Sequence, residues 1–272
     1  MKKNKLLSVK EFSAFSGIEQ STLRYWDEIG LFSPECRNEE NNYRYYSPRQ
    51  ITTVKFIKVL SSLNIPLKTI RSLSNSRSPE SIMALLKEHE KRLDMEMHRI
   101  HESYSLIHTF RDLIKDGLKA DISQLSVCKL EEMPIIIGPK IDFSDGEQFH
   151  TNLTGFYKKN ETPHINTDYP IGGYFETMDA FLENPSQPTN IFSINPAGHD
   201  IKPAGEYIVG YVKGYYGDMK NVPENIVAFA GKHGLEPKGP VYASYLHNEL
   251  CVDDPSQYLA RVSVMVSPPP FS

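Results

Sequence analysis

The chain has 272 residues, of which 39% are hydrophobic, 11% aromatic and 24% charged. No apolar run approaches the about 20 residues that a membrane-spanning helix needs, while 15 Tyr, 13 Phe and many aliphatic residues suffice for a folded core. The three cysteines lie far apart, which disfavours a disulfide framework or a CxxC zinc site. The basic N-terminus lacks the apolar stretch of a signal peptide, so we expect a cytoplasmic protein.

Charge is distributed unevenly along the chain. Residues 1–77 carry 13 Lys and Arg against 7 Asp and Glu, whereas residues 78–272 carry 17 against 27. A basic part followed by an acidic part indicates an end that faces nucleic acid, joined to a part with another task. Chance scatter of surface charge is the alternative interpretation.

Residues 6–76 have the pattern of short helices separated by turns. Ser8 and Glu11 have the spacing of a capping box, which predicts a helix that stops near Gly17. A second helix is predicted over residues 19–30. Two short helices joined by a tight turn are typical of a helix-turn-helix.

An aromatic, strand-prone segment, residues 43–46, follows a run rich in turn residues and predicts a β-ribbon beside the helices. Ser47 and Pro48 then predict the start of a third helix, with Ser as the N-cap and Pro in the first turn. A further short helix is expected after Pro66.

Basic and aromatic residues occur together on the second helix and the ribbon. Arginine forks pair with phosphates or guanine edges, and tyrosine hydroxyls donate to phosphate oxygens. The alternative is that Tyr25, Trp26 and Tyr45 are core aromatics. The candidate DNA-contacting residues are Ser21, Thr22, Arg24, Tyr25, Trp26, Tyr43, Arg44, Tyr45, Arg49 and Lys58.

A long helix is predicted from Pro79 to about Lys119, because no Gly or Pro lies between Glu80 and Asp116. Its heptad d positions are all apolar, which favours a dimerising coiled coil over a helix packed on its own domain. These positions are Leu86, Leu93, Ile100, Ile107 and Ile114. We interpret the four histidines of this helix as surface residues and not as metal ligands.

The remainder of the chain has the pattern of alternating strands and helices, with a faint sign of internal duplication. Expected strands are 135–137, 173–175, 206–212, 241–245 and 258–266, and expected helices are 147–157 and 222–233. The last strand alternates in polarity and is predicted to be half-buried. Residues 267–270, Ser-Pro-Pro-Pro, are expected to end the fold.

Residues 7–11, 22–34 and 43–47 together resemble the N-terminal domain of MerR-family transcription regulators. The resemblance implies a winged helix-turn-helix whose second helix enters the major groove and whose wing grips phosphates. It also implies an antiparallel coiled-coil homodimer that distorts a pseudo-palindromic promoter so that RNA polymerase can engage it. Trp26 stands where the family has Tyr. The absence of Cys between Asn38 and Val127 disfavours the metal- and redox-sensing branches of the family.

Residues 203–207 and 238–242, with the strand from Tyr258, resemble the GyrI-like effector domain of the BmrR-type, multidrug-sensing branch. The resemblance implies a duplicated α/β unit with a ligand cleft between its halves, but Ala243 stands where a drug-facing Glu is common. Aromatic faces attract lipophilic cations, and residues 121–272 are acidic. The candidate ligand residues are Tyr174, Glu176, Glu206, Tyr207, Tyr215, Tyr242, Ala243, Tyr245 and Tyr258.

These patterns together predict an α+β protein with three parts: a winged helix-turn-helix (1–76), a dimerisation helix (77–120) and a duplicated α/β effector domain (121–272). We expect a nucleoid-associated activator whose partners are double-stranded promoter DNA, RNA polymerase, a second copy of the chain and a lipophilic cation. No catalytic motif is present, and neither a cofactor nor a metal is expected. The alternatives are a GyrI-like small-molecule hydrolase and a drug-sequestering binding protein.

Overall fold

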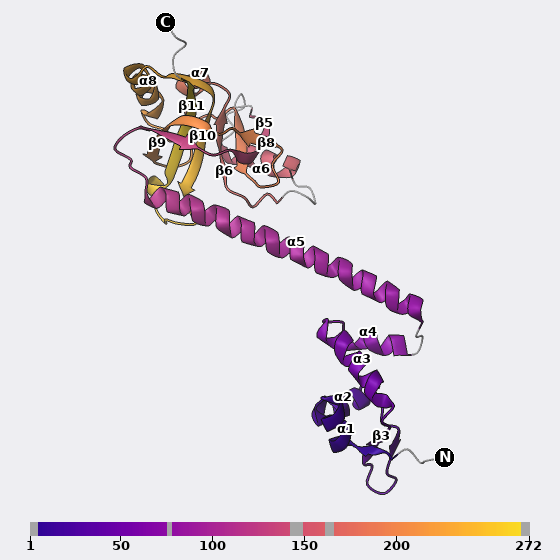
Figure 1. Ribbon diagram of the computed structural model, residues 1–272. Coiled ribbons are helices and arrows are strands. Elements are labelled where there is room, and N and C mark those ends of the chain that lie inside the picture. Colours follow the sequence, from indigo (N-terminus) through magenta and orange to yellow (C-terminus); the bar gives the residue numbers. More distant parts are fainter. Residues whose placement is uncertain (1–4, 75–77, 142–148, 161–165, 268–272) are drawn as a thin grey trace. The chain divides into compact units, whose positions relative to one another are not determined.

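The computed structural model describes residues 5–74, 78–141, 149–160 and 166–267 (Figure 1). The chain divides into two compact units, residues 1–98 and 99–272, and the division falls within one long helix. Among the described residues, no helix is both long enough and apolar enough to cross a membrane. The two units are described separately.

The first unit combines short helices with a small sheet, as predicted. The sheet has the strand order β1-β3-β2, and the long β2–β3 connection makes it a wing beside the helices. The elements are β1 (Leu7–Ser8), α1 (Val9–Ser16), α2 (Gln20–Glu28), β2 (Cys36–Arg37), β3 (Arg44–Tyr46), α3 (Gln50–Ser62) and α4 (Leu67–Ser74).

The capping box predicted for the first helix is confirmed. The Ser8 hydroxyl oxygen accepts a hydrogen bond from the Glu11 backbone N–H at 3.3 Å, and the Glu11 carboxylate accepts one from the Ser8 N–H at 2.8 Å. Helix α1 ends at Gly17, whose φ of 68° lies in the left-handed region that Gly adopts without strain.

The third helix begins two residues later than predicted. Arg49 occupies the N-cap position and α3 starts at Gln50. Residues 47–50 form a turn closed by a 2.9 Å bond from the Gln50 N–H to the Ser47 carbonyl oxygen. The Ser47 hydroxyl accepts from the Arg49 N–H within that turn, so its capping capacity is used before the helix proper begins.

Aromatic rings fill the core of the first unit. Phe12, Phe32 and Tyr46 stack with ring centroids 4.5–5.9 Å apart, and Leu23 and Trp26 from α2 pack against the same core. This core holds α2 in place against α1 and the wing.

The long helix α5 (Pro79–Leu118) has the extent that the sequence predicts. Its first four d residues are exposed, with Ile100 59% accessible, and the a residues Met83, Met97 and Tyr104 lie exposed beside them. Such an apolar stripe at heptad spacing is typical of coiled-coil helices. The surface interpretation is wrong for His89, which is buried and lies 2.5 Å from the Leu63 carbonyl oxygen.

The second unit is built on one antiparallel sheet of eight strands, in the order β4-β9-β11-β10-β6-β7-β5-β8. Its elements are β4 (Ser126–Leu130), β5 (Met133–Lys140), α6 (Phe149–Asn160), β6 (Ile171–Phe175), α7 (Met178–Glu183), β7 (Asn190–Ile194), β8 (Asp200–Lys202), β9 (Gly205–Lys213), α8 (Val222–His233), β10 (Glu236–His247), a 3-10 turn (Pro255–Gln257) and β11 (Leu259–Ser267). The predicted helix over 147–157 overlaps α6, although its first two residues lie outside the described ranges, as do residues 268–270 of the predicted tail.

The internal duplication is visible in the topology. The strands of β5-α6-β6-β7 lie in the spatial order first, third, second, and the strands of β9-α8-β10-β11 repeat that order. Pairing of β6 with β10 joins the two halves into one sheet. The sequence signal was faint because β4, β7 and β8 are only three to five residues long.

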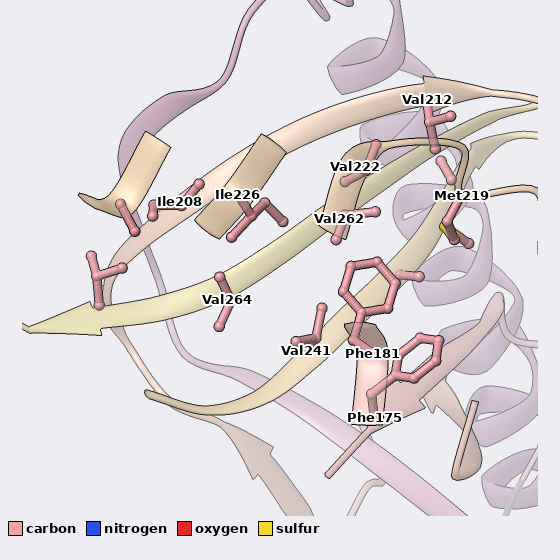
Figure 2. Packing of buried hydrophobic residues seen from close by; sticks show 14 of the residues in the cluster. Phe175, Phe181, Ile208, Val212, Met219, Val222, Ile226, Val241, Val262 and Val264 are labelled. Atoms are coloured by element: carbon pink, nitrogen blue, oxygen red, sulfur yellow. The ribbon is translucent and has the colours of Figure 1, made fainter. Parts of the chain in front are cut away.

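The sheet is covered on both faces. Figure 2 shows Phe181 from α7 and Ile226 from α8 packed over Phe175, Val262 and Val264 on one face. The other face buries a second core that includes Leu113 from α5. The prediction of a half-buried last strand is therefore wrong. Even the polar positions of β11 are covered, and Arg261 pairs with Asp116 at 3.1 Å.

Candidate functional sites

Helix α2 presents its polar side to solvent and its apolar side to the core. Ser21, Arg24 and Tyr25 are exposed, and Thr22 is half-buried. Trp26 is only 5% exposed and packs in the core, which favours the packing role over a phosphate contact. The surface available to DNA on this helix is therefore formed by the other four predicted residues.

The wing carries the next group of predicted contacts. Tyr43 is exposed, Tyr45 is half-buried, and their rings meet edge-on with centroids 5.5 Å apart. Arg49 is exposed at the start of α3. Lys58 is also exposed, but its ammonium group donates to the Gly17 carbonyl oxygen at 3.1 Å and so stabilises the end of α1.

A buried carboxylate ties the wing to α2. The Asp27 side chain is 2% exposed, and its Oδ2 accepts hydrogen bonds from Arg37 Nη2 at 2.6 Å and from Arg44 Nε at 2.5 Å. The hydrogen bond that Arg44 donates to Asp27 raises the pKa of Arg44. Asp27 follows the fully buried Leu23 by four residues, and that spacing is the sequence signal for an acidic group on the buried face of α2.

The predicted tyrosines of the second unit fall into two groups. The first, which we call the lysine cluster, consists of Lys202, Tyr207, Tyr242 and Ser263. The Lys202 Nζ lies 4.8 Å and 4.7 Å from the ring centroids of Tyr207 and Tyr242, and it donates to the Ser263 hydroxyl oxygen at 2.7 Å. Tyr174 meets the Tyr242 ring edge-on at 5.6 Å.

Burial governs the protonation of the lysine cluster. Lys202 is 3% exposed, and its desolvation, followed by repulsion from Arg261, lowers its pKa from 10.5 to about 7. Burial also raises the pKa of Tyr207 to about 12. At neutral pH the lysine is thus divided between its charged and neutral forms, while Tyr207 keeps its proton.

Curvature of the sheet places Lys202 in this cluster. Six strand spacings separate β8 from β9, which in a flat sheet is about 29 Å. Only Pro203 and Ala204 connect the two strands, and a chain of that length spans at most about 11 Å. The sheet therefore curls until its ends approach, and Lys202 from β8 reaches over β9, β10 and β11.

The second group, which we call the glutamate cluster, consists of Tyr215, Tyr216, Tyr245, Tyr258 and Glu249. The Tyr216 ring lies 4.4 Å from Tyr245 and 5.5 Å from Tyr258, centroid to centroid, and its hydroxyl donates to Glu249 Oε2 at 2.6 Å. Burial, followed by this bond, raises the pKa of Tyr216. A hollow of about 160 Å³ adjoins the cluster, and its lining includes Phe110, Asp168, Tyr169, Tyr216 and Glu249.

The structure does not bring the predicted ligand residues into one place. Three lie at or beside the lysine cluster (Tyr174, Tyr207 and Tyr242), and three belong to the glutamate cluster (Tyr215, Tyr245 and Tyr258). Of the other predicted positions, Glu176 pairs with Lys140 at 2.8 Å, Glu206 is exposed on β9, and Ala243 is fully buried in the core facing α7 and α8.

Sequence reasoning missed the charged member of each cluster. A lone lysine such as Lys202 in a three-residue strand gives no local signal of burial, because lysine is usually exposed. Glu249 lies in the turn after β10 and carries no motif. Within the described ranges, no group of three or more His, Cys, Asp or Glu side chains could hold a metal ion.

The first unit, with α2 exposed beside a three-stranded wing, is a winged helix-turn-helix DNA-binding domain. Residues 7–76 match the family model of the MerR HTH family regulatory protein. Residues 7–76 are therefore similar to the DNA-binding domain of MerR-type transcription regulators.

Comparison with known proteins finds relatives that extend beyond this domain. The Multidrug-efflux transporter 2 regulator of Bacillus subtilis (strain 168) is 28% identical over 96% of this chain and 97% of its own length. The Multidrug-efflux transporter 1 regulator of the same organism is 25% identical over 57% of this chain and 59% of its own. The EcmrR–DNA complex seen by cryo-electron microscopy covers 96% of this chain and 100% of its own, with 18% identity and a TM-score of 0.39. The matched family and both relatives are regulators rather than enzymes.

Proposed function

We propose that this protein is an effector-responsive transcription activator that binds a pseudo-palindromic promoter as a homodimer. The observation that carries the proposal is the MerR-type domain with Arg24 and Tyr25 exposed on α2. In this proposal the protein acts on DNA in the cytoplasm, with RNA polymerase as its partner at the promoter.

DNA recognition is divided between α2 and the wing. Arg24 and Tyr25 face base edges and phosphates in the major groove, while Tyr43, Arg44 and Arg49 contact phosphates at the side. Arg44 bonds Asp27 through Nε, which leaves its two terminal nitrogens to face a phosphate. The phosphate contacts make affinity strongly salt-dependent.

The exposed stripe of α5 supports dimerisation. Its d residues from Leu86 to Ile107 lie on one face over three heptads, and pairing with a second copy in antiparallel orientation would remove them from water. A two-fold dimer presents two identical α2 helices and therefore requires two half-sites in inverted repeat. The effector favours the dimer conformation that untwists the promoter spacer, so that RNA polymerase engages both promoter elements.

The glutamate cluster suits a lipophilic cation. Its tyrosine rings offer faces for stacking and cation–π attraction, and Glu249 and Asp168 add carboxylates beside the hollow. The charge that Ala243 does not provide is thus available from Glu249, on the turn after the same strand. We assign this cluster as the cationic effector position.

Selection from a random duplex library tests the DNA-binding proposal. The wild-type chain is expected to enrich inverted repeats, because a two-fold dimer places two copies of α2 on the duplex. Arg24→Ala is expected to weaken binding to the enriched site at least tenfold, since a bidentate base contact contributes about 1–3 kcal/mol. Arg71→Ala serves as the control, because Arg71 lies outside the proposed DNA contacts and bonds the Ile29 carbonyl oxygen. Enrichment of single, unrepeated sites would contradict the proposal.

Charge placed in the α5 stripe is expected to separate the dimer. Ile100→Glu puts a carboxylate at the centre of the seam, where burial is costly, and should give a monomer at micromolar concentration in light scattering. His98→Glu adds the same carboxylate two residues away, at an exposed position outside the seam, and should leave the dimer intact. A dimeric Ile100→Glu chain would show that α5 is not the interface.

A further inference from the structure

Lys202 is a buried amine that faces aromatic rings and one hydroxyl instead of an acid. In the described part of the chain, no carboxylate lies within ion-pair distance of its Nζ. A buried charge is costly without a partner, and two rings and a serine compensate only in part. Among the described residues, Lys202 therefore has no negatively charged partner.

The charged groups nearest the cluster do not supply that partner. Arg261 on β11 is also cationic, and its own partner is Asp116 of α5. Asp200 on β8 accepts from the Ile137 backbone N–H at 3.1 Å and lies 3.4 Å from His199. From β6, Tyr174 presents a ring to the cluster, and the acid that follows it, Glu176, is paired with Lys140.

We propose that the lysine cluster is a second effector position, which takes a lipophilic acid. The aromatic body of the ligand lies against Tyr174 and Tyr242, and its carboxylate or sulfonate accepts hydrogen bonds from the Lys202 ammonium and the Ser263 hydroxyl. This proposal rests on the proposed function in one respect, namely that the second unit binds effectors.

The electrostatics of the cluster select an acid over a cation. Lys202 and Arg261 together repel a cation, whereas an acid supplies the missing counter-charge. Tyr174 and Tyr211 are only half-buried at the margins of the same face, so a flat ligand can reach the lysine by displacing ring edges and not backbone. An acid that binds there also draws a proton onto the amine, since the charged form makes the stronger bond.

Calorimetric titration of the full-length protein with three naphthalenes of similar size tests the proposal. The probes are 2-naphthoate, the neutral 2-naphthamide and the cationic (2-naphthylmethyl)trimethylammonium. Naphthoate is expected to bind at least tenfold more tightly than naphthamide near pH 7. Its binding should take up protons, which is measured as a dependence of the heat on the ionisation enthalpy of the buffer.

Two lysine variants distinguish a specific contact with Lys202 from a general effect of removing one positive charge. Lys202→Met keeps the length of the side chain and should abolish both the preference for naphthoate and the proton uptake. Lys213→Met removes an exposed lysine of β9 that bonds the Gln257 side chain, and it should retain both. Equal affinity for naphthoate and naphthamide in the wild type, or an unchanged preference in Lys202→Met, would overturn the proposal.

The cationic probe distinguishes this inference from the proposed function. Binding of the cation that Glu249→Gln weakens, without any preference for naphthoate, would uphold the cationic effector position and refute the lysine site. Binding of naphthoate that depends on Lys202, without binding of the cation, would give the reverse result. If none of the probes binds, both assignments fail.

Discussion

Replacement of Asp27 by Asn is expected to weaken binding to the selected DNA site at least tenfold and to destabilise the first unit by about 2 kcal/mol. Loss of one partner from a fully buried ion pair costs about 3–5 kcal/mol, and the expected cost is lower here because Arg37 and Arg44 keep access to water. The DNA effect arises because the wing loses the bond that positions it against α2. Urea unfolding followed by fluorescence of Trp26, the single tryptophan, reports on this unit directly.

Glu28→Gln is the matched control for Asp27→Asn. Both variants remove one negative charge from the same end of α2, but Glu28 is exposed. Removal of a negative charge by itself strengthens attraction to phosphates. A loss of affinity for DNA in Asp27→Asn but not in Glu28→Gln would therefore result from a displaced wing and not from the change in net charge. Equal behaviour of the two variants would show that the buried carboxylate does not organise the wing.

Lys202→Met is expected to stabilise the protein near pH 7 by about 1–4 kcal/mol, the range known for replacement of buried ion pairs by apolar residues, because it removes the cost of burying an amine that has no counter-ion. The gain should depend on pH. Below pH 7 the lysine is charged in the folded and the unfolded chain, so the full cost of its burial applies to the wild type. Between about pH 7 and pH 10.5 the folded chain has released the proton that the unfolded chain still binds, so the cost declines as pH rises.

Urea unfolding followed by circular dichroism at pH 6.5, 8 and 9.5 measures this difference. The advantage of Lys202→Met over the wild type should be largest at pH 6.5 and smallest at pH 9.5. Lys213→Met should track the wild type at all three values, because that lysine is exposed. A constant difference across the range would mean that the Lys202 amine does not change its protonation in the folded state.

Local signals in the sequence predicted the first unit and α5 well. The capping box at Ser8, the glycine that ends α1 and the unbroken heptads of α5 are all encoded within a few residues of where they act. The N-cap of α3 was misplaced by two residues because the Ser47 hydroxyl serves a turn with the same local chemistry as a cap.

The spatial grouping of the candidate ligand residues could not be predicted, because it depends on strand order. Alternation along β10 indicates that Tyr242 and Tyr245 point to opposite faces, but only the pairing of β10 with β6 and β11 determines what lies beside each ring. Lys202 was missed for a related reason. Its burial results from curvature of the whole sheet, and three residues of β8 cannot encode that curvature.

Because the sheet curls, Lys202 also connects two parts of the sheet that are distant in strand order. Lys202 lies on β8, which follows the first copy of the duplicated unit, whereas Ser263, Tyr207 and Tyr242 all belong to the second copy. The 2.7 Å hydrogen bond from the Lys202 amine to the Ser263 hydroxyl therefore links β8 to β11 of the second copy. A molecule inserted between the amine and the hydroxyl would break that hydrogen bond and widen the curl, so that its binding would change the opening angle between β8 and the second copy.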